Sequence, residues 1–352
     1  MPCHKSLMLR ALSPLQARIA AILLALACLW AALLSPAAPQ PPTGLPFYSD
    51  IQLYHAIAAR VSQGEDYYEA ATTLQRAHNF PTQPFVTVRE PTLSLLGASF
   101  GWERMRGLLG GLLLLATVLW YRQLQSARLP ERIGAGLAIL LGGGMVSQPA
   151  LVVQHEQWAG VLLALALLFR GGRLWPVALL FAGAALAIRE LALPFVLLAL
   201  LFALVERRRH EVLGWTLLVV VFALGMAFHA HAVNAVAGAH DPVSQGWNGL
   251  RGPAAVLRDL IDVSLLNRLP GALARPLALL ALFGWLAVPL RQARFAVLWF
   301  AGYALMLALF ARSQNFYWAI MLLPAWFIGF AFLPRALSDL ANAALAGRKA
   351  AL

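Results

Sequence analysis

Carboxylates gather in one polar stretch of an otherwise apolar chain. Residues 46–91 hold five of the fifteen acidic residues, while 61% of the whole sequence is hydrophobic. Within this stretch Asp50 follows Ser49, where a helical spacing of apolar residues begins. A carboxylate in that position can act as a general base, or it can cap the helix beside Ser49. Our prediction is an active-site loop outside the membrane, with Asp50 as its base.

Two further ionisable pairs interrupt long apolar runs. As one helix, residues 174–206 would be about 50 Å long, well beyond the roughly 30 Å core of a bilayer. This run is therefore expected to fold back at its Arg-Glu pair, and residues 133–169 at their His-Glu pair. Ionisable groups recessed in a membrane are costly unless they pair or function. We take these four as candidate substrate-binding residues, or else as structural ion pairs at turns: His155, Glu156, Arg189 and Glu190.

The apolar segments around these residues predict an all-α, polytopic membrane protein. The mean hydropathy is +0.71 and only 12% of residues are charged, which is outside the range of soluble globular domains. We treat residues 1–352 as a single membrane domain. About ten segments are long enough to span a bilayer, or nearly so: 19–38, 105–121, 133–152, 157–169, 174–188, 191–206, 211–230, 271–290, 295–311 and 316–333.

Basic residues predict the orientation of these segments. With the N-terminus inside, the inner segments hold 16 of the 27 basic residues and four of the 15 acidic ones, as the positive-inside rule requires. Ten spans return the C-terminal tail, 334–352, to the cytoplasm. The outer loops then cover about 39–104 and 231–270. Because the basic residues lie in short turns between spans, the net charge of +12 does not indicate nucleic-acid binding.

The first outer loop is expected to carry surface helices. An amphipathic helix begins at Asp50 and ends at Gly64, and a second begins directly afterwards. Residues 79–91 hold three prolines and are expected to be irregular, while Pro91 opens a short interfacial helix. In the second outer loop, the spacing of apolar residues predicts a helix over 254–266.

The sequence carries none of the common cofactor motifs. Walker A, GxGxxG and HExxH patterns are absent. His229 and His231 are two residues apart and would point in different directions on a helix, so they do not indicate a metal site. No cofactor is therefore predicted, and a divalent metal is not indicated.

A set of residues in the first hundred positions carries a family resemblance: Tyr48-Ser49-Asp50, Tyr54, Gly64-Glu65, Tyr67-Tyr68, Arg76-Ala77-His78, Pro81, Pro84 and Arg89-x-Pro91-Thr92. On these residues the chain resembles a bacterial member of the GT-C superfamily of integral-membrane glycosyltransferases, in the style of the polyprenyl-phosphate-sugar-dependent mannosyl- and arabinosyltransferases. The resemblance implies an inner-membrane protein with a periplasmic active site. It also implies a catalytic Asp in the first outer loop and a polyprenyl-phosphate-linked sugar donor. The acceptor stays open among a glycan, a lipid and a protein.

An inverting transfer of this kind needs a base for the acceptor hydroxyl and cations for the leaving phosphate. Three outer arginines lie where the membrane meets water: Arg89 before the interfacial helix, Arg189 at a recessed tip, and Arg312 before the last span. We expect Arg189 and Arg312 to bind the phosphate, with Arg89 as the third choice. Arg89 and Arg189 each precede a Glu, but adjacent side chains on a helix point in different directions, so neither Glu need neutralise its neighbour. The donor-binding candidates beside them are Glu90, Asn315 and Tyr317.

Two other classes of function fit the same sequence. A lipid or glycan transporter, or flippase, would use the buried Arg-Glu and His-Glu pairs as an intramembrane relay. A catalytically silent assembly protein would need neither these pairs nor Asp50. An enzyme needs Asp50 but no ion gradient, whereas a transporter needs a gradient or a counter-substrate.

Overall fold

The computed structural model describes residues 7–34, 49–144 and 148–346, so residues 39–48, which include Tyr48, and 347–352 of the predicted tail lie outside it. Within these ranges every regular element is helical, which confirms the all-α prediction. The longer helices are α2 (Pro14–Leu33), α3 (Asp50–Ser62), α4 (Tyr67–Ala77), α5 (Thr92–Phe100), α6 (Trp102–Gln123), α7 (Leu129–Gly142), α8 (His155–Phe169), α9 (Trp175–Leu186), α10 (Leu193–Val205), α11 (Arg209–Val236), α12 (Gly252–Asp262), α13 (Gly271–Gly284), α14 (Ala293–Phe310) and α16 (Ile328–Leu345). The short elements are α1 (Leu7–Arg10), η1 (Phe85–Thr87), η3 (Pro149–Val153), η4 (Glu190–Ala192), η5 (Leu265–Arg268), η6 (Trp285–Ala287), η7 (Ser313–Met321) and α15 (Leu323–Trp326).

Several helices have the composition of membrane spans. In the described residues, α2, α11 and α14 are long and apolar enough to cross a bilayer by themselves. A fourth candidate is the pair formed by η7 and Leu323–Leu345, which is bent by 53°. Four further apolar stretches are shorter: α8, α9, Glu190–Val205 and Gly271–Ala287. These helices indicate a membrane protein. The number of described helices that are both long enough and apolar enough to span a bilayer is below the ten predicted.

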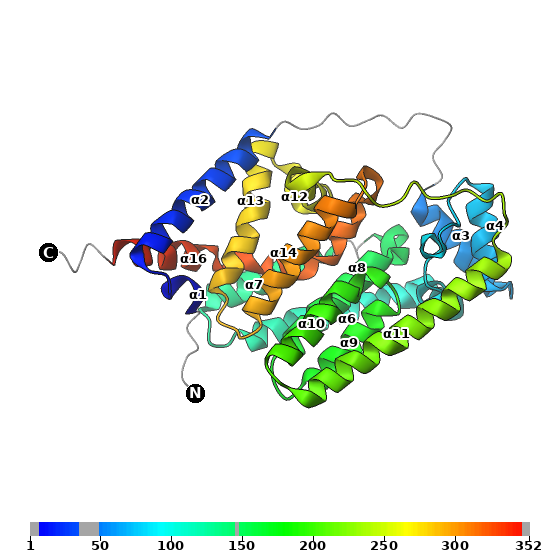
Figure 1. Cartoon of the computed structure of the whole chain (residues 1–352), viewed down its shortest axis with the longest axis horizontal. Helices are drawn as coiled ribbons and strands as arrows, with labels where there is room; N and C mark the ends of the chain where they lie inside the picture. The colour runs from blue at the N-terminus through cyan, green and yellow to red at the C-terminus, as the bar shows by residue number, and fades with distance from the viewer. Residues whose placement is uncertain (1–6, 35–48, 145–147, 347–352) are drawn as a thin grey trace.

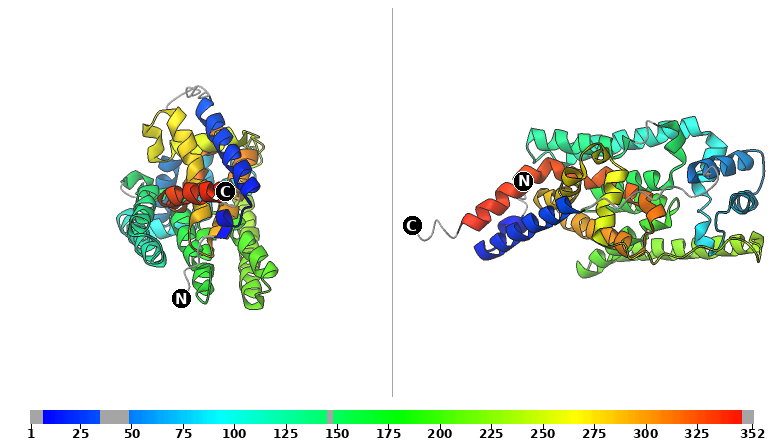
Figure 2. Two further views of the ribbon diagram at one scale, coloured as in Figure 1. Left: turned by 90° about the vertical axis from the view of Figure 1, so that its left-hand side faces the viewer. Right: turned by 90° about the horizontal axis from the view of Figure 1, so that it is seen from above.

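Helix α8 forms the centre of the molecule. All of its side chains from His155 to Leu168 are buried, as expected for a helix that is apolar on every side. The indole of Trp120 on α6 donates a hydrogen bond of 3.0 Å to the carbonyl of Ala164. In the right-hand view of Figure 2, α6 and α7 run along one long edge of the molecule and α11 along the opposite edge.

The helix ends gather at two opposite sides. In Figure 1 the turns between α10 and α11 and between α13 and α14 lie at the lower left, together with α1. Helices α3 and α4 lie at the right, and α12 lies at the top near the middle. The predicted inner turns and the predicted outer loops are thus separated by the length of the apolar helices.

The structure confirms one of the two turns predicted at ionisable pairs and contradicts the other. The run 174–206 divides into α9 and α10 at Arg189, as predicted. The run 133–169 instead divides well before His155, because α7 ends at Gly142 and α8 begins with His155. Consecutive glycines after α7 and Pro149 in η3 stop the first helix early. The prediction that the His-Glu pair forms a turn was therefore wrong: both side chains are buried at the start of a helix.

The C-terminal helix also differs from the prediction. The predicted tail begins at Pro334, but α16 continues through this proline to Leu345. Arg335 on α16 forms an ion pair with Glu131 on α7, and Asp339 pairs with Arg10 at 2.8 Å. These two ion pairs link α16 to α7 and to α1.

Candidate functional site

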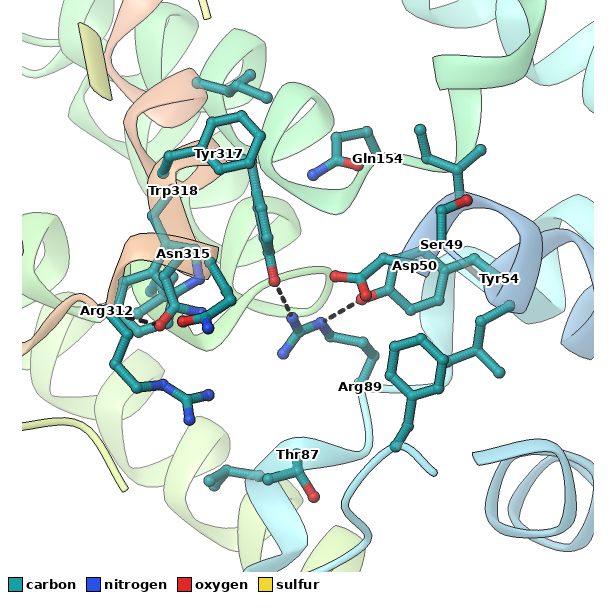
Figure 3. Close-up of a pocket in the computed structure, with 18 of the residues that line it drawn as sticks. Ser49, Asp50, Tyr54, Thr87, Arg89, Gln154, Arg312, Asn315, Tyr317 and Trp318 are labelled. Carbon is teal, nitrogen blue, oxygen red and sulfur yellow. Dashed lines mark hydrogen bonds between the residues drawn. The ribbon is translucent and has the colours of Figure 1, made fainter. Parts of the chain in front are cut away.

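A cavity of about 740 Å³ lies where several helices lead into the predicted outer loops. Its walls come from α3, the segment before α5, the end of α12, the end of α14 and η7, and most of its lining is apolar. Figure 3 shows the few polar groups that reach it. The charged side chains in the lining are Asp50, Arg89, Glu190, Asp262 and Arg312.

Asp50 reaches the cavity from the first turn of α3. The cap of this helix is Ser49, whose hydroxyl accepts from the backbone N–H of Gln52 while the Gln52 side chain accepts from the Ser49 N–H. The alternative interpretation of Asp50 as the helix cap was therefore wrong. Its carboxylate has no hydrogen-bond or ion-pair partner among the described residues, so it is free to act on a molecule in the cavity.

Arg89 is held in the cavity by tyrosines. Its Nε donates to the hydroxyl of Tyr54 at 3.0 Å, and its Nη2 donates to the hydroxyl of Tyr317 at 3.1 Å. The hydroxyl of Tyr67 donates to the Arg89 carbonyl at 2.7 Å. Burial raises the pKa of Tyr54 well above its ordinary value, so this phenol stays neutral. Across 49–144 and 148–346, no carboxylate pairs with the Arg89 charge.

Arg312 lies on another wall of the same cavity (Figure 3). Its Nη1 donates to the side chain of Gln245 at 3.2 Å, while its buried Nε has no partner within the described part of the chain. Asn315 fixes the backbone, since its side-chain oxygen accepts from the Arg312 N–H at 3.1 Å. Arg251 donates to the Arg312 carbonyl at 2.9 Å and is itself paired with Asp259. Arg312 is thus well positioned and carries an unneutralised charge.

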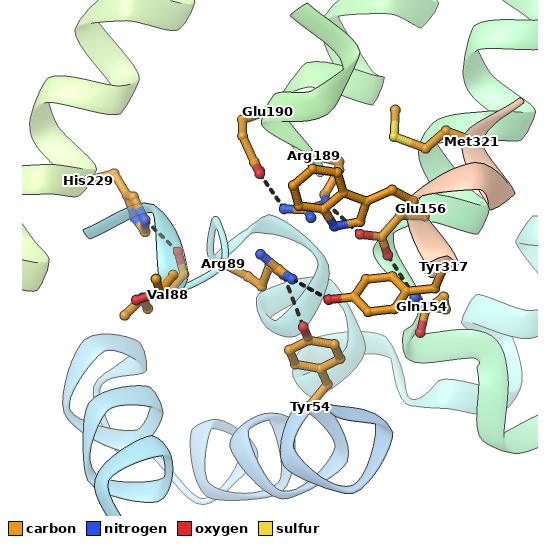
Figure 4. Close-up of polar contacts among 12 residues, drawn as sticks. Tyr54, Val88, Arg89, Gln154, Glu156, Arg189, Glu190, His229, Tyr317 and Met321 are labelled. Atoms are coloured by element: carbon orange, nitrogen blue, oxygen red, sulfur yellow. Dashed lines mark hydrogen bonds and ion pairs between the residues drawn. The ribbon is translucent and has the colours of Figure 1, made fainter. Parts of the chain in front are cut away.

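Arg189 is in a different environment from the one expected. Its side chain is fully buried, its Nε donates to Glu156 at 2.6 Å, and its Nη1 forms an ion pair with Glu190. Gln154 donates to the other Glu156 oxygen at 2.8 Å. Figure 4 shows this chain of contacts beside Arg89. The expectation that Arg189 lacks a tight carboxylate partner was wrong, and only Glu190 and Gln154 of this network line the cavity.

Two more predicted residues lie behind the cavity wall. The His155 ring packs edge-on against Tyr54, with the ring centroids 4.8 Å apart, and neither ring nitrogen has a hydrogen-bond partner in the described residues. Glu90 is 8% exposed and its carboxyl oxygens likewise accept from no donor there. Burial, and then the charge of Glu190, raise the pKa of Glu90 well above its ordinary value. Both effects favour the protonated form of Glu90.

The two predicted outer loops dock on each other beside the cavity. Arg76 on α4 donates to both oxygens of Asp241, at 2.5 and 3.0 Å. Asp241 also accepts from the Thr82 hydroxyl at 2.9 Å and from the Gly238 N–H at 3.0 Å. This docking brings residues of the second loop, including Ser244 and Trp247, into the cavity lining. Sequence reasoning did not identify it, because the paired residues are far apart in the chain.

His229 has a structural position. One ring nitrogen contacts the Val88 carbonyl at 3.0 Å and the other contacts the Tyr68 hydroxyl at 3.3 Å. It thereby links α11 to the segment that leads to Arg89. In the ranges the structure describes, no cluster of three or more His, Cys, Asp or Glu side chains has metal-binding geometry.

Sequence reasoning also missed Asp262. It lies at the end of α12, lines the cavity, and forms no ion pair within the described ranges. A negative charge is disfavoured at a helix C-terminus. The position of this Asp at the end of a predicted helix was therefore the sequence signal that could have suggested a functional role. Comparison with known proteins adds no further assignment: no family model, curated protein or solved structure matches this chain.

Proposed function

We propose that this protein is a membrane glycosyltransferase that moves a sugar from a polyprenyl-phosphate donor to an acceptor hydroxyl, with inversion. One observation carries the proposal: a carboxylate without a partner, Asp50, and two arginines without a carboxylate partner, Arg89 and Arg312, line a single mainly apolar cavity. A polar reaction centre with an apolar wall suits a donor whose phosphate is attached to a long hydrocarbon chain.

Each group has a defined task in this reaction. Asp50 takes the proton from the acceptor hydroxyl as its oxygen bonds to the anomeric carbon. The bond from that carbon to the phosphate oxygen breaks, and polyprenyl phosphate leaves with its electron pair. Arg89 and Arg312 stabilise the negative charge that grows on this phosphate. The apolar lining of the cavity lowers the local dielectric constant, which strengthens these interactions.

The finer architecture belongs to the same proposal. It assigns the chain to a bacterial inner membrane, with the cavity facing the periplasm and both termini in the cytoplasm. Ten passes would include the shorter helices α8, α9, α10 and α13. A helix of twelve residues such as α9 is about 18 Å long, so this part of the protein would thin the bilayer around the recessed Arg189 network.

Asp50→Asn tests the assignment of the base. We expect sugar transfer from a polyprenyl-phosphate donor to be lost, with unfolding stability changed by no more than about 1 kcal/mol, because Ser49 supplies the helix cap. Glu69→Gln is the matched control, since Glu69 is an exposed carboxylate on α4 that does not line the cavity. Transfer at the parental rate by purified Asp50→Asn would remove Asp50 as the base.

The same preparations separate the alternative functions. Movement of a lipid-linked glycan across vesicles that depends on an ion gradient, with no new glycosidic bond, would indicate a transporter. The closed pairing of Arg189 with Glu156 and Glu190 favours a structural role for these residues over a relay. Cells that tolerate both Asp50→Asn and loss of the buried pair would indicate an assembly protein.

A further inference from the structure

A second pocket lies at the other end of α6 from the candidate site. Its volume is about 380 Å³, and it is formed where the ends of α6 and α8 meet the start of α7. Leu168 and Phe169 of α8 contribute apolar surface. The polar lining consists of Arg122, Gln123, Gln125 and Arg132. No carboxylate from the described residues lines this pocket.

In the described residues, no carboxylate neutralises the guanidinium groups of this pocket. Arg132 lies over the ring of Tyr121, 4.1 Å from its centroid, and its Nε donates to the Tyr121 carbonyl at 3.3 Å. This contact leaves both terminal nitrogens of Arg132 available. Arg122 lies in the last turn of α6, where the helix dipole favours a cation. Among the described residues, neither arginine forms an ion pair.

The acidic residues of the predicted inner segments are already paired with other arginines. Glu131 pairs with Arg335, and Asp339 pairs with Arg10. Glu206 and Glu211 both pair with Arg208. These four are the acidic residues of the predicted inner segments, so none remains to balance the two pocket arginines. The pocket is a site of positive charge bordered by apolar side chains.

We propose that this pocket binds the phosphate group of an anionic membrane lipid. Basic pockets between membrane helices on the cytoplasmic side are suited to lipid head groups, because a phosphate accepts from several guanidinium donors while the acyl chains stay in the bilayer. Gln123 and Gln125 provide neutral donors for the remaining oxygens of the head group. The site does not depend on the proposed transferase activity, since it involves none of the residues of the outer cavity.

Lipid binding by the purified full-length chain in neutral detergent tests this proposal. Short-chain phosphatidylglycerol and phosphatidylcholine are titrated, and bound lipid is counted by native mass spectrometry. We expect a preference for phosphatidylglycerol that becomes about fivefold weaker or more in Arg122→Gln and in Arg132→Gln. Arg173→Gln is the matched control, because Arg173 is exposed in a neighbouring predicted inner turn and does not line the pocket.

Further arms distinguish the sources of the phosphate and keep the test decisive. If inorganic phosphate displaces phosphatidylglycerol, the pocket recognises the phosphate group itself. If inorganic phosphate does not displace it, the pocket recognises the intact lipid. Arg122 is exposed and its side chain makes no hydrogen bond or ion pair in the described residues, so Arg122→Gln remains informative if Arg132→Gln fails to fold. An unchanged lipid preference in Arg122→Gln, or an equal loss in Arg173→Gln, overturns the proposal in favour of general attraction to the surface.

Discussion

The arginines in and beside the cavity differ in what balances their charge. Arg89 is held by neutral phenols, whereas Arg189 is held by two carboxylates. We expect Arg89→Lys and Arg312→Lys to lower transfer about tenfold or more, which is roughly 1.4 kcal/mol or greater, since lysine lacks the forked donors that match a phosphate. Steady-state rates and melting temperatures of the purified variants are the measurements.

Arg189→Lys serves as the contrasting variant. It leaves part of a buried ion-pair network unsatisfied, so we expect a lower melting temperature to accompany any loss of rate. Equal rates for Arg89→Lys, Arg312→Lys and the parent would mean that these arginines only reach toward lipid head groups.

Glu90 gives a pH-dependent prediction. Its pKa in the folded protein is raised by burial and by the nearby Glu190 carboxylate, with Arg189 opposing the shift. The folded state therefore holds a proton that the unfolded state releases above about pH 4.3. Stability due to this group is present below that pH and is lost as the pH rises through the folded pKa.

Replacing Glu90 with Gln should remove this dependence. We expect Glu90→Gln to melt at a higher temperature than the parent at pH 7 and at nearly the same temperature at pH 4. Thermal unfolding across pH 4–8, followed by intrinsic fluorescence, provides the measurement, with Glu69→Gln as control. A mutant curve parallel to that of the parent would show that Glu90 is ionised in the folded state.

At the level of elements, docking of the two outer loops depends on Asp241. This carboxylate accepts four hydrogen bonds while its own residue is buried. The Arg76 side chain pairs with it, and the pKa of Asp241 is held well below its ordinary range by that hydrogen bond. We expect Asp241→Asn to lower the unfolding free energy by about 2 kcal/mol.

A matched substitution in another ion pair gives the comparison. Glu103 pairs with Arg106 at 2.7 Å on the surface and is 78% exposed. Glu103→Gln should change stability by less than about 1 kcal/mol, because exposed pairs contribute little. Chemical denaturation of both variants tests the difference. Equal effects would mean that the loops are held mainly by their backbone contacts, such as the 2.7 Å bond from Ser244 N–H to the Gln83 carbonyl.

The sequence predicted local elements better than spatial partners. The start of α3, the end of that helix near Gly64, which has a positive φ of 95°, and the division at Arg189 all depend on neighbouring residues. The partners of Arg189 and Asp241 come from Glu156 and Arg76, which spacing along the chain cannot identify. Hydropathy also placed the end of α7 too late, because it gives no weight to the glycines that stop the helix.

For the whole molecule, orientation in the membrane remains the largest testable prediction. Basic residues outnumber acidic ones in the predicted inner turns, and short loops with this excess stay in the cytoplasm. The folded chain places those turns on the side opposite to α3, α4 and α12 (Figure 1). The cavity with Asp50 should therefore face the periplasm, where a polyprenyl-linked sugar would meet its acceptor.

Single cysteines can report this orientation in intact cells. After Cys3 and Cys28 are replaced by serine, Glu69→Cys should react with a membrane-impermeant maleimide from outside, and His210→Cys should react only after the membrane is opened. Both positions are exposed, on α4 and at the start of α11. Labelling of His210→Cys from outside, with protection of Glu69→Cys, would show that the orientation is the reverse of the one predicted. A cavity opening to the cytoplasm would then exclude a periplasmic transfer reaction at Asp50.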